Sequence, residues 1–211
     1  MSSYGELISS LKILKSVKEK RHAIKALAHH CSNRAYQLRI VQGGGWKDAI
    51  LPLIISLDDM CRKYAALAIS NLSVNVGTYP LLLQEEVVRH IAPILYEEVS
   101  EVTVYILIAI GNFATSNLFW PVLHELNILN GIVLVLKNAK NIEEVIINSL
   151  FALSNFTADP KHRQMMVDLR VDDMVWRFIV SENYKIMFYT LALIRGLTVT
   201  PEGQERFPQL G

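Results

Sequence analysis

Three asparagines recur at nearly equal intervals in this chain of 211 residues, and each follows a similar apolar phrase. Asn71 follows Ala-Leu-Ala-Ile-Ser, Asn112 follows Ile-Ala-Ile-Gly and Asn155 follows Phe-Ala-Leu-Ser, which separates the asparagines by 41 and 43 residues. A carboxamide offers both a donor and an acceptor, so one such side chain can pair with a peptide N–H and C=O whatever side chains the peptide carries. A self-similar period of this length is the signature of a helical solenoid.

The sequence lacks the motifs of catalysis. It contains no phosphate-cradling Gly-Lys-Ser/Thr loop, no Gly-x-Ser-x-Gly elbow and no paired-histidine zinc helix. His29, His30 and Cys31 are consecutive, and consecutive residues of a helix point in different directions, so they cannot converge on one ion. We therefore expect no enzyme activity, no catalytic residue, no metal site and no cofactor.

Composition and charge point to a folded protein that binds other proteins. Hydrophobic residues make up 51% of the chain and charged residues 19%, which argues against disorder. Twenty-one Lys and Arg oppose twenty Asp and Glu, so no global charge attracts nucleic acid. Cys31 and Cys61 are distant in sequence and form no Cys-x-x-Cys pair, which indicates reduced thiols.

The N-terminus predicts a cytoplasmic protein. It lacks the basic start and apolar core of a signal peptide, and Ser2 in place of glycine excludes myristoylation. The longest apolar run, residues 102–110, is about half of the roughly 20 residues that a bilayer span requires. We expect no transmembrane segment. Peripheral attachment to a membrane or the cytoskeleton would involve regions other than the helices of the repeats.

Apolar residues at i, i+3, i+4 and i+7 predict one long amphipathic helix per repeat. The long helices are expected at 16–32, 58–73, 100–115, 141–158 and 181–198. Shorter apolar helices are expected before them at 6–14, 47–57, 87–97, 128–137 and 172–180. A third set is expected at 33–41, 79–86, 120–127 and 161–169. No alternating strand pattern competes, so the fold class is all-α with three helices per unit.

Turn residues punctuate this pattern. The triplet 43–45 (Gly-Gly-Gly), the pair Asn130-Gly131 and the pair Asp159-Pro160 are read as turns or helix stops. Pro80, Pro121 and Pro160 suit a first helical turn, where their missing N–H removes no bond. Two further prolines lie inside expected short helices, which should be kinked or begin later: Pro52 and Pro93.

The segment 62–72, Arg-Lys-Tyr-Ala-Ala-Leu-Ala-Ile-Ser-Asn-Leu, resembles the third helix of an armadillo repeat, and Asn112-Phe113 and Ser154-Asn155-Phe156 repeat its ending. The resemblance extends over essentially the whole chain. It implies a right-handed α-α superhelix, a single armadillo-repeat solenoid over residues 1–211 with about five repeats of three helices. The repeats fall at 1–32, 33–73, 74–115, 116–158 and 159–200, with the start of another at 201–211.

The resemblance also implies a peptide-binding groove lined by the third helices, in which the asparagines bond the peptide backbone. Residues four and seven positions before each asparagine share its face and should border the same groove. The alternative is that each asparagine only ties its repeat to the neighbouring helix. The candidate groove residues are Asn71, Asn112, Asn155, Tyr64, Leu67, Tyr105, Ile108, Asn148, Phe151, Tyr189 and Arg195.

Comparison within the family favours a scaffold or adaptor. Importin-alpha-type members carry tryptophan where this chain has Leu67, Ile108 and Phe151, so recognition of nuclear signals is disfavoured. The expected groove is mainly apolar, which favours partners with apolar anchors in an extended or helical segment. The chain is most similar to the vacuolar-type and armadillo-repeats-only adaptors. The alternatives are a transport receptor for basic signals and a regulatory segment of a larger enzyme.

The first repeat is rich in positive charge, and the two ends of the array lack caps. Residues 12–25 include six cationic side chains, which form a solvated face or an electrostatic rim for an acidic partner or lipid headgroup. The array begins and stops inside repeats, without polar caps. It is therefore expected to be part of a longer array or to self-associate through its ends.

Overall fold

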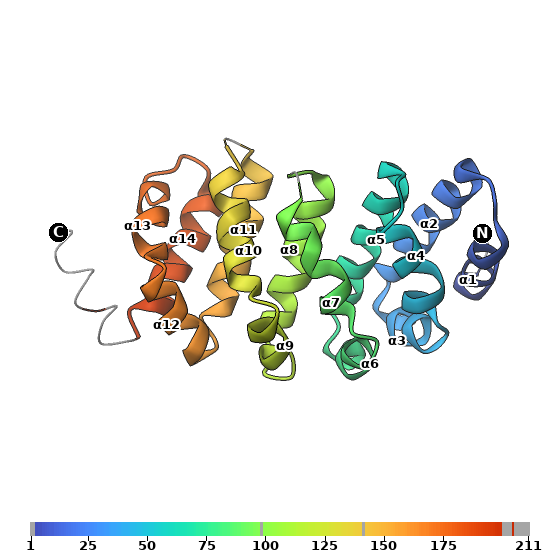
Figure 1. The fold of residues 1–211 in the computed structure, drawn as a ribbon, viewed down its shortest axis with the longest axis horizontal. Helices are drawn as coiled ribbons and strands as arrows, with labels where there is room; N and C mark the ends of the chain where they lie inside the picture. Colours follow the sequence, from blue (N-terminus) through green and yellow to red (C-terminus); the bar gives the residue numbers. More distant parts are fainter. Residues whose placement is uncertain (1–2, 98, 141, 200–203, 205–211) are drawn as a thin grey trace. The chain divides into compact units, whose positions relative to one another are not determined.

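The computed structural model describes residues 3–97, 99–140, 142–199 and 204, and within these residues the secondary structure is helical, with no strand. Two compact units divide the chain. Unit 1 comprises Met1–Ile94 and Ser100–Ile110, and unit 2 comprises Leu95–Val99 and Gly111–Gly211. Helices α2 and α5 lie side by side in unit 1, as α11 and α14 do in unit 2 (Figure 1).

Unit 1 contains three long helices and the shorter elements between them. The long helices are α2 (Val17–Cys31), α5 (Asp59–Leu72) and most of α8 (Glu101–Ala114). The shorter elements are α1 (Tyr4–Ile13), α3 (Arg34–Gln42), a π-helical segment (Gly45–Ile50), α4 (Leu51–Ile54), a 3₁₀ turn (Val76–Thr78), α6 (Tyr79–Gln84), α7 (Val87–Ile91) and part of a 3₁₀ segment (Ala92–Tyr96).

Unit 2 continues the pattern from the end of α8. Its long helices are α11 (Glu143–Phe156) and α14 (Tyr184–Leu197). The shorter elements are α9 (Trp120–Glu125), α10 (Ile128–Asn138), α12 (Pro160–Asp168), α13 (Val171–Val175) and a 3₁₀ turn (Trp176–Phe178). The predicted set of long and short helices is confirmed, with boundaries that differ by a few residues.

Helix α5 shows how the sequence specifies a long helix. The Asp58 side chain accepts a hydrogen bond of 2.9 Å from the Cys61 N–H and so caps the N-terminus of the helix. Ala65, Ala66 and Ala68 are fully buried. Small side chains on the buried face let neighbouring helices approach closely.

The prolines have the predicted effect. Pro52 lies in the first turn of α4, directly after the π-helical segment, and Pro93 lies in the 3₁₀ segment that begins where α7 ends. Pro80, Pro121 and Pro160 occupy first turns of α6, α9 and α12. A proline removes one helical hydrogen bond, so the two short helices change type at these positions.

The expected turn at Asn130-Gly131 is wrong, because both residues lie inside α10. A Cβ on Gly131 would stand 3.0 Å from the Leu95 side chain, so this glycine serves close packing. The turn instead precedes the helix at Asn127, which has φ of 52°. Gly44, Glu86 and Arg170 adopt positive φ at the equivalent position before the second element of their repeats.

Within the described residues, no single helix has the length and apolar character that crossing a bilayer requires. Only Asp59–Leu72 taken together with Val76–Gln84 meets those criteria, and this pair is bent by 102°. The expected start of a further repeat at 201–211 lies, apart from residue 204, outside the described residues.

Candidate peptide-binding site

The candidate residues of unit 1 form half-buried stripes on the long helices. On α5, Tyr64, Leu67 and Asn71 are half-buried, whereas the alanines between them are fully buried. On α8, Tyr105 and Ile108 are half-buried in the same spacing. The two helices are joined near their N-terminal ends, where Lys63 Nζ lies 2.8 Å from a Glu101 carboxylate oxygen. The spacing predicted these partly accessible faces.

Unit 2 repeats this arrangement. Asn112 at the end of α8, and Asn148, Phe151 and Asn155 on α11, are half-buried. The Phe151 ring meets the Tyr189 ring of α14 edge to face, with centroids 5.5 Å apart. Two predicted aromatic residues are therefore in direct contact, and both remain partly open to solvent.

The side chains of Asn71 and Asn155 bridge consecutive long helices. The Asn71 Nδ2 group donates to the Ala28 carbonyl at 3.1 Å, and Asn155 Nδ2 donates to the Gly111 carbonyl at 3.0 Å. Both carbonyls belong to the last turn of a helix, where no intrahelical donor is available. Each carboxamide has a second N–H and an oxygen beyond this bond. The inter-repeat bond weighed as the alternative is therefore present, and peptide contact by these asparagines stays a prediction.

A second bond at the helix ends recurs with constant spacing. Six residues after a terminal carbonyl, a side chain turns back and donates to it. No sequence pattern predicts this bond, because the donor is a different residue type each time. The pairs are Gln37 with Cys31, Thr78 with Leu72, Tyr79 with Ser73, Trp120 with Ala114, and Arg163 with Thr157.

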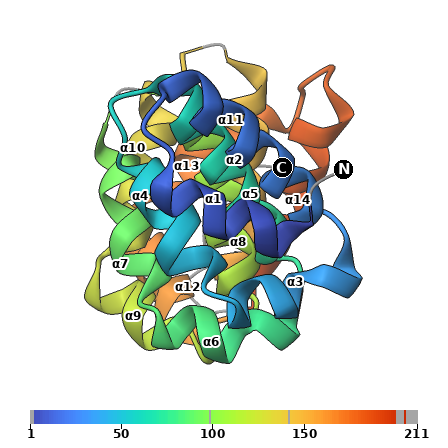
Figure 2. The same ribbon diagram turned by 90° about the vertical axis from the view of Figure 1, so that its right-hand side faces the viewer.

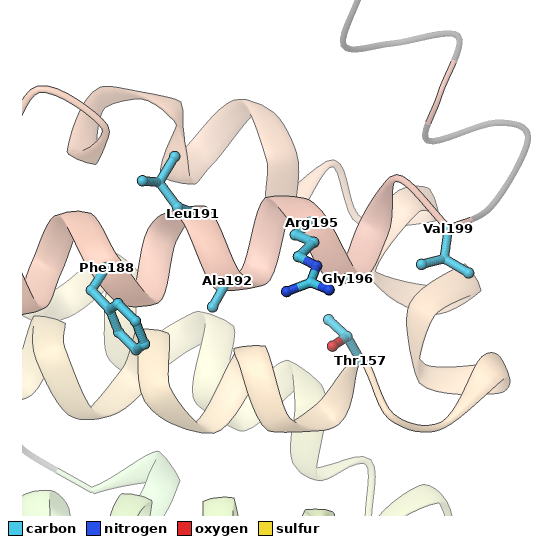
Figure 3. Close-up of a pocket in the computed structure, with 7 residues that line it drawn as sticks. All are labelled: Thr157, Phe188, Leu191, Ala192, Arg195, Gly196 and Val199. Carbon is cyan, nitrogen blue, oxygen red and sulfur yellow. The ribbon is translucent and has the colours of Figure 1, made fainter.

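A pocket of about 480 Å³ lies on α14, and it contains one predicted site residue, Arg195. Its floor is mostly apolar, and Phe188 and Leu191 are exposed. In Figure 3, Phe188, Ala192 and Arg195 extend from α14 toward the side on which Thr157 lies. The full lining is Thr157, Phe188, Leu191, Ala192, Arg195, Gly196 and Val199.

Sequence reasoning missed a cluster of His124, Asp159 and His162, whose potential ligand atoms lie within 4.8 Å of one another. His124 Nε2 contacts Asp159 Oδ2, and His162 Nδ1 lies 2.8 Å from the same oxygen. Burial and the neighbouring His124 lower the pKa of His162 to about 4, against the opposing effect of Asp159. The only sequence signal is Asp-x-x-His at the start of α12, 35 residues after His124.

The geometry of this cluster does not favour a metal centre. The two imidazole rings stack with centroids 3.7 Å apart and planes inclined by 9°. Ring-nitrogen lone pairs lie in the ring plane, so one ion cannot lie along both lone pairs while the rings are parallel. The cluster acts instead as a tie between α9 and α12, with Asp159 also capping α12 through the Lys161 N–H at 3.0 Å.

Comparisons with known proteins identify the fold. No family model matches the chain, and no curated protein matches it. The designed armadillo repeat protein YIII(Dq)4CqI is similar in structure, with a TM-score of 0.89, 19% sequence identity, and coverage of 99% of this chain and 88% of that one.

Other solved structures give the same result. An engineered protein superposes with a TM-score of 0.88 at 15% identity, over 99% of this chain and 87% of its own. A designed armadillo repeat protein in complex with the peptide (KR)4 gives a TM-score of 0.82 at 20% identity, over 92% and 81%. The protein therefore has the all-α armadillo-repeat solenoid fold.

Proposed function

We propose that this protein is a non-catalytic scaffold that binds a segment of a partner protein along the half-buried faces of its long helices. The observation that carries the proposal is the recurrence in both units of Tyr or Phe and Asn at helical spacing, partly open to solvent. The solved complex of a similar fold with a peptide supports this use of the architecture.

The chemistry of the stripes favours a peptide with apolar anchors. Tyr64, Tyr105 and Phe151 offer aromatic surface, and aromatic residues are enriched at the centres of protein interfaces. The pocket on α14 adds Phe188 and Leu191, with Arg195 at its edge. An apolar side chain therefore fits that pocket, and Arg195 can meet a carboxylate of the same segment.

Recognition of a basic signal is the second candidate, and the composition of the stripes argues against it. None of the eleven candidate positions carries a carboxylate, and Arg195 adds positive charge. A run of lysine and arginine would therefore find no counter-charge there. The absence of tryptophan from these positions also removes the aromatic faces that bind cationic side chains best.

A peptide-display experiment tests the proposal. Random peptides are selected on the immobilised protein, and the affinity of enriched peptides is measured by fluorescence polarisation beside (KR)4. We expect enriched peptides to carry spaced apolar residues and to bind more tightly than (KR)4. The double variant Tyr105→Ala/Phe151→Ala should weaken binding at least tenfold, equivalent to loss of about 1.4 kcal/mol.

The matched control places two alanines on exposed positions of α12, Lys161→Ala/Gln164→Ala. This variant should bind the selected peptides as the wild type does. Selection of basic peptides alone, or equal loss in both double variants, would overturn the proposal in favour of another surface.

A further inference from the structure

Two neighbouring loops of unit 1 expose aliphatic side chains to solvent. Ile13 is 77% exposed at the end of α1, and Ile55 and Leu57 are 67% and 104% exposed in the loop after α4. Val17, the first residue of α2, is also exposed. Figure 2 shows the two loops running side by side at the upper left of unit 1. These two loops, together with the first turns of α2, form one edge of unit 1.

An ion pair joins α2, which follows the first loop, to the second loop. The Arg21 guanidinium of α2 donates to the Asp58 carboxylate of the second loop, with Nη2 and Oδ2 2.5 Å apart. This contact raises the pKa of Arg21 and holds the pKa of Asp58 well below its usual range. Asp58 is also anchored as the N-cap of α5. Asp58 thus ties the second loop both to α2 and to the start of α5.

The same edge carries positive charge that is available to a partner. Among the described residues, no carboxylate forms an ion pair with Lys15, Lys18 or Lys20, whereas Lys12 pairs with Asp48 at 2.7 Å. Glu19 and Asp59 are the exposed acids nearby. The stretch from Lys12 to Lys25 carries six cationic residues against the single acid Glu19, and Asp58 is already paired with Arg21.

The equivalent loops of unit 2 also expose apolar side chains, namely Tyr96, Ile142 and Val180. Their flanking charges are mixed, as with Lys140 and Glu143, so positive charge does not accumulate there. Exposed apolar side chains in the loop before the long helix therefore recur from repeat to repeat. Among the described residues, an excess of lysine over acid beside these loops occurs in the first two repeats.

We propose that this edge of unit 1 docks on an anionic lipid bilayer, with Ile13, Ile55 and Leu57 entering the headgroup region and Lys15, Lys18 and Lys20 meeting lipid phosphates and carboxylates. Aliphatic tips beside lysines are the combination that peripheral membrane binding uses. Lysine is depleted at protein interfaces, which makes an acidic protein the weaker match. This inference does not rest on the peptide site, because its residues lie outside the stripes.

Vesicle cosedimentation tests the proposal on the whole chain. The probes are vesicles of phosphatidylcholine alone and vesicles that also contain phosphatidylserine. We expect binding only to the anionic vesicles, with an affinity that falls as salt is added. Lys15→Gln/Lys18→Gln/Lys20→Gln should weaken binding about a hundredfold, because each lysine near an anionic surface contributes about fivefold. Ile55→Ser/Leu57→Ser should also weaken it, because exposed apolar area no longer inserts.

Val180→Ser is the matched control, since it removes an exposed aliphatic side chain from the equivalent loop of unit 2. It should leave vesicle binding unchanged. The proposal is overturned by no sedimentation with anionic vesicles, by equal sedimentation with neutral ones, or by no effect of the lysine and loop variants. A polyglutamate peptide that binds through the same lysines while vesicles do not would assign the edge to an acidic protein and also overturn it.

Discussion

The side-chain amide of Asn155 donates a hydrogen bond of 3.0 Å to the backbone carbonyl of Gly111, which lies 44 residues earlier in the preceding long helix. This carbonyl lies in the last turn of α8, where no helical N–H can reach it. Asn71 makes the equivalent bond to Ala28. The asparagines of the second and fourth repeats therefore each supply a donor to a carbonyl at the end of the previous long helix.

Replacement of Asn155 by alanine should lower the free energy of unfolding by about 1 kcal/mol, because the Gly111 carbonyl loses its donor. Urea denaturation measures the change. Asn148→Ala is the control, since its Nδ2 donates only to the Glu144 carbonyl of its own helix and both residues are near the surface. Equal costs for the two variants would show that the inter-helix bond adds nothing to stability.

Gly111→Ala should destabilise the protein by about 2 kcal/mol through overpacking. A Cβ at this position would stand 2.7 Å from Phe151 Cε1 and 3.1 Å from Ala152 Cα, so the helices would have to separate. Gly5→Ala is the matched control, because no atom lies within 4 Å of its added Cβ. Thermal unfolding should show a lower midpoint for Gly111→Ala and an unchanged or higher midpoint for Gly5→Ala.

Acidification should destabilise the protein through His162. The pKa of this buried imidazole falls from 6.5 to about 4 on folding, so the unfolded chain binds more protons between these values. Stability is therefore fully present above pH 6.5 and declines as the pH falls toward 4, by about 2 kcal/mol at pH 5.

His162→Phe preserves a buried aromatic ring beside Phe156 and removes the titrating group. Unfolding free energies at several pH values should decline less steeply for this variant than for the wild type. Identical slopes would mean that His162 is protonated equally in the folded and unfolded chains.

The two cysteines should resist thiol reagents in the native state. Burial raises the pKa of Cys31 to about 12 and that of Cys61 to about 11, and the thiolate is the reactive form. Both side chains are almost completely buried. A disulfide-exchange reagent at mildly alkaline pH should therefore label the native protein slowly and label both residues promptly in denaturant. Rapid native labelling at Cys61 would indicate that the start of α5 opens locally.

Much of the fold could be predicted because the helices carry local signals. Alanine at 65, 66 and 68, the N-cap Asp58 and the prolines of the first turns each act within a few residues, so one sequence reveals them. The prediction of a turn at Asn130-Gly131 was wrong because Gly131 is required for close packing against Leu95, a tertiary contact that the local sequence does not reveal.

The site was less predictable because its details depend on contacts across repeats. Helical spacing identified the half-buried faces of Tyr64 and Phe151, but the bonds from Asn71 and Asn155 to earlier carbonyls require knowledge of the neighbouring helix. The pairing of His124 with Asp159 spans 35 residues and has no local periodicity. The exposed loop residues Ile55 and Leu57 look like core residues by type, and only the structure shows them in solvent.

Side-chain amide NMR spectra recorded during titration with a display-selected peptide would locate the bound peptide on the long helices. We expect the side-chain amide resonances of Asn71, Asn112 and Asn155 to shift together, while that of the exposed Gln164 on α12 stays unchanged. Shifts at Gln164 with the three asparagines unchanged would contradict binding along the long helices.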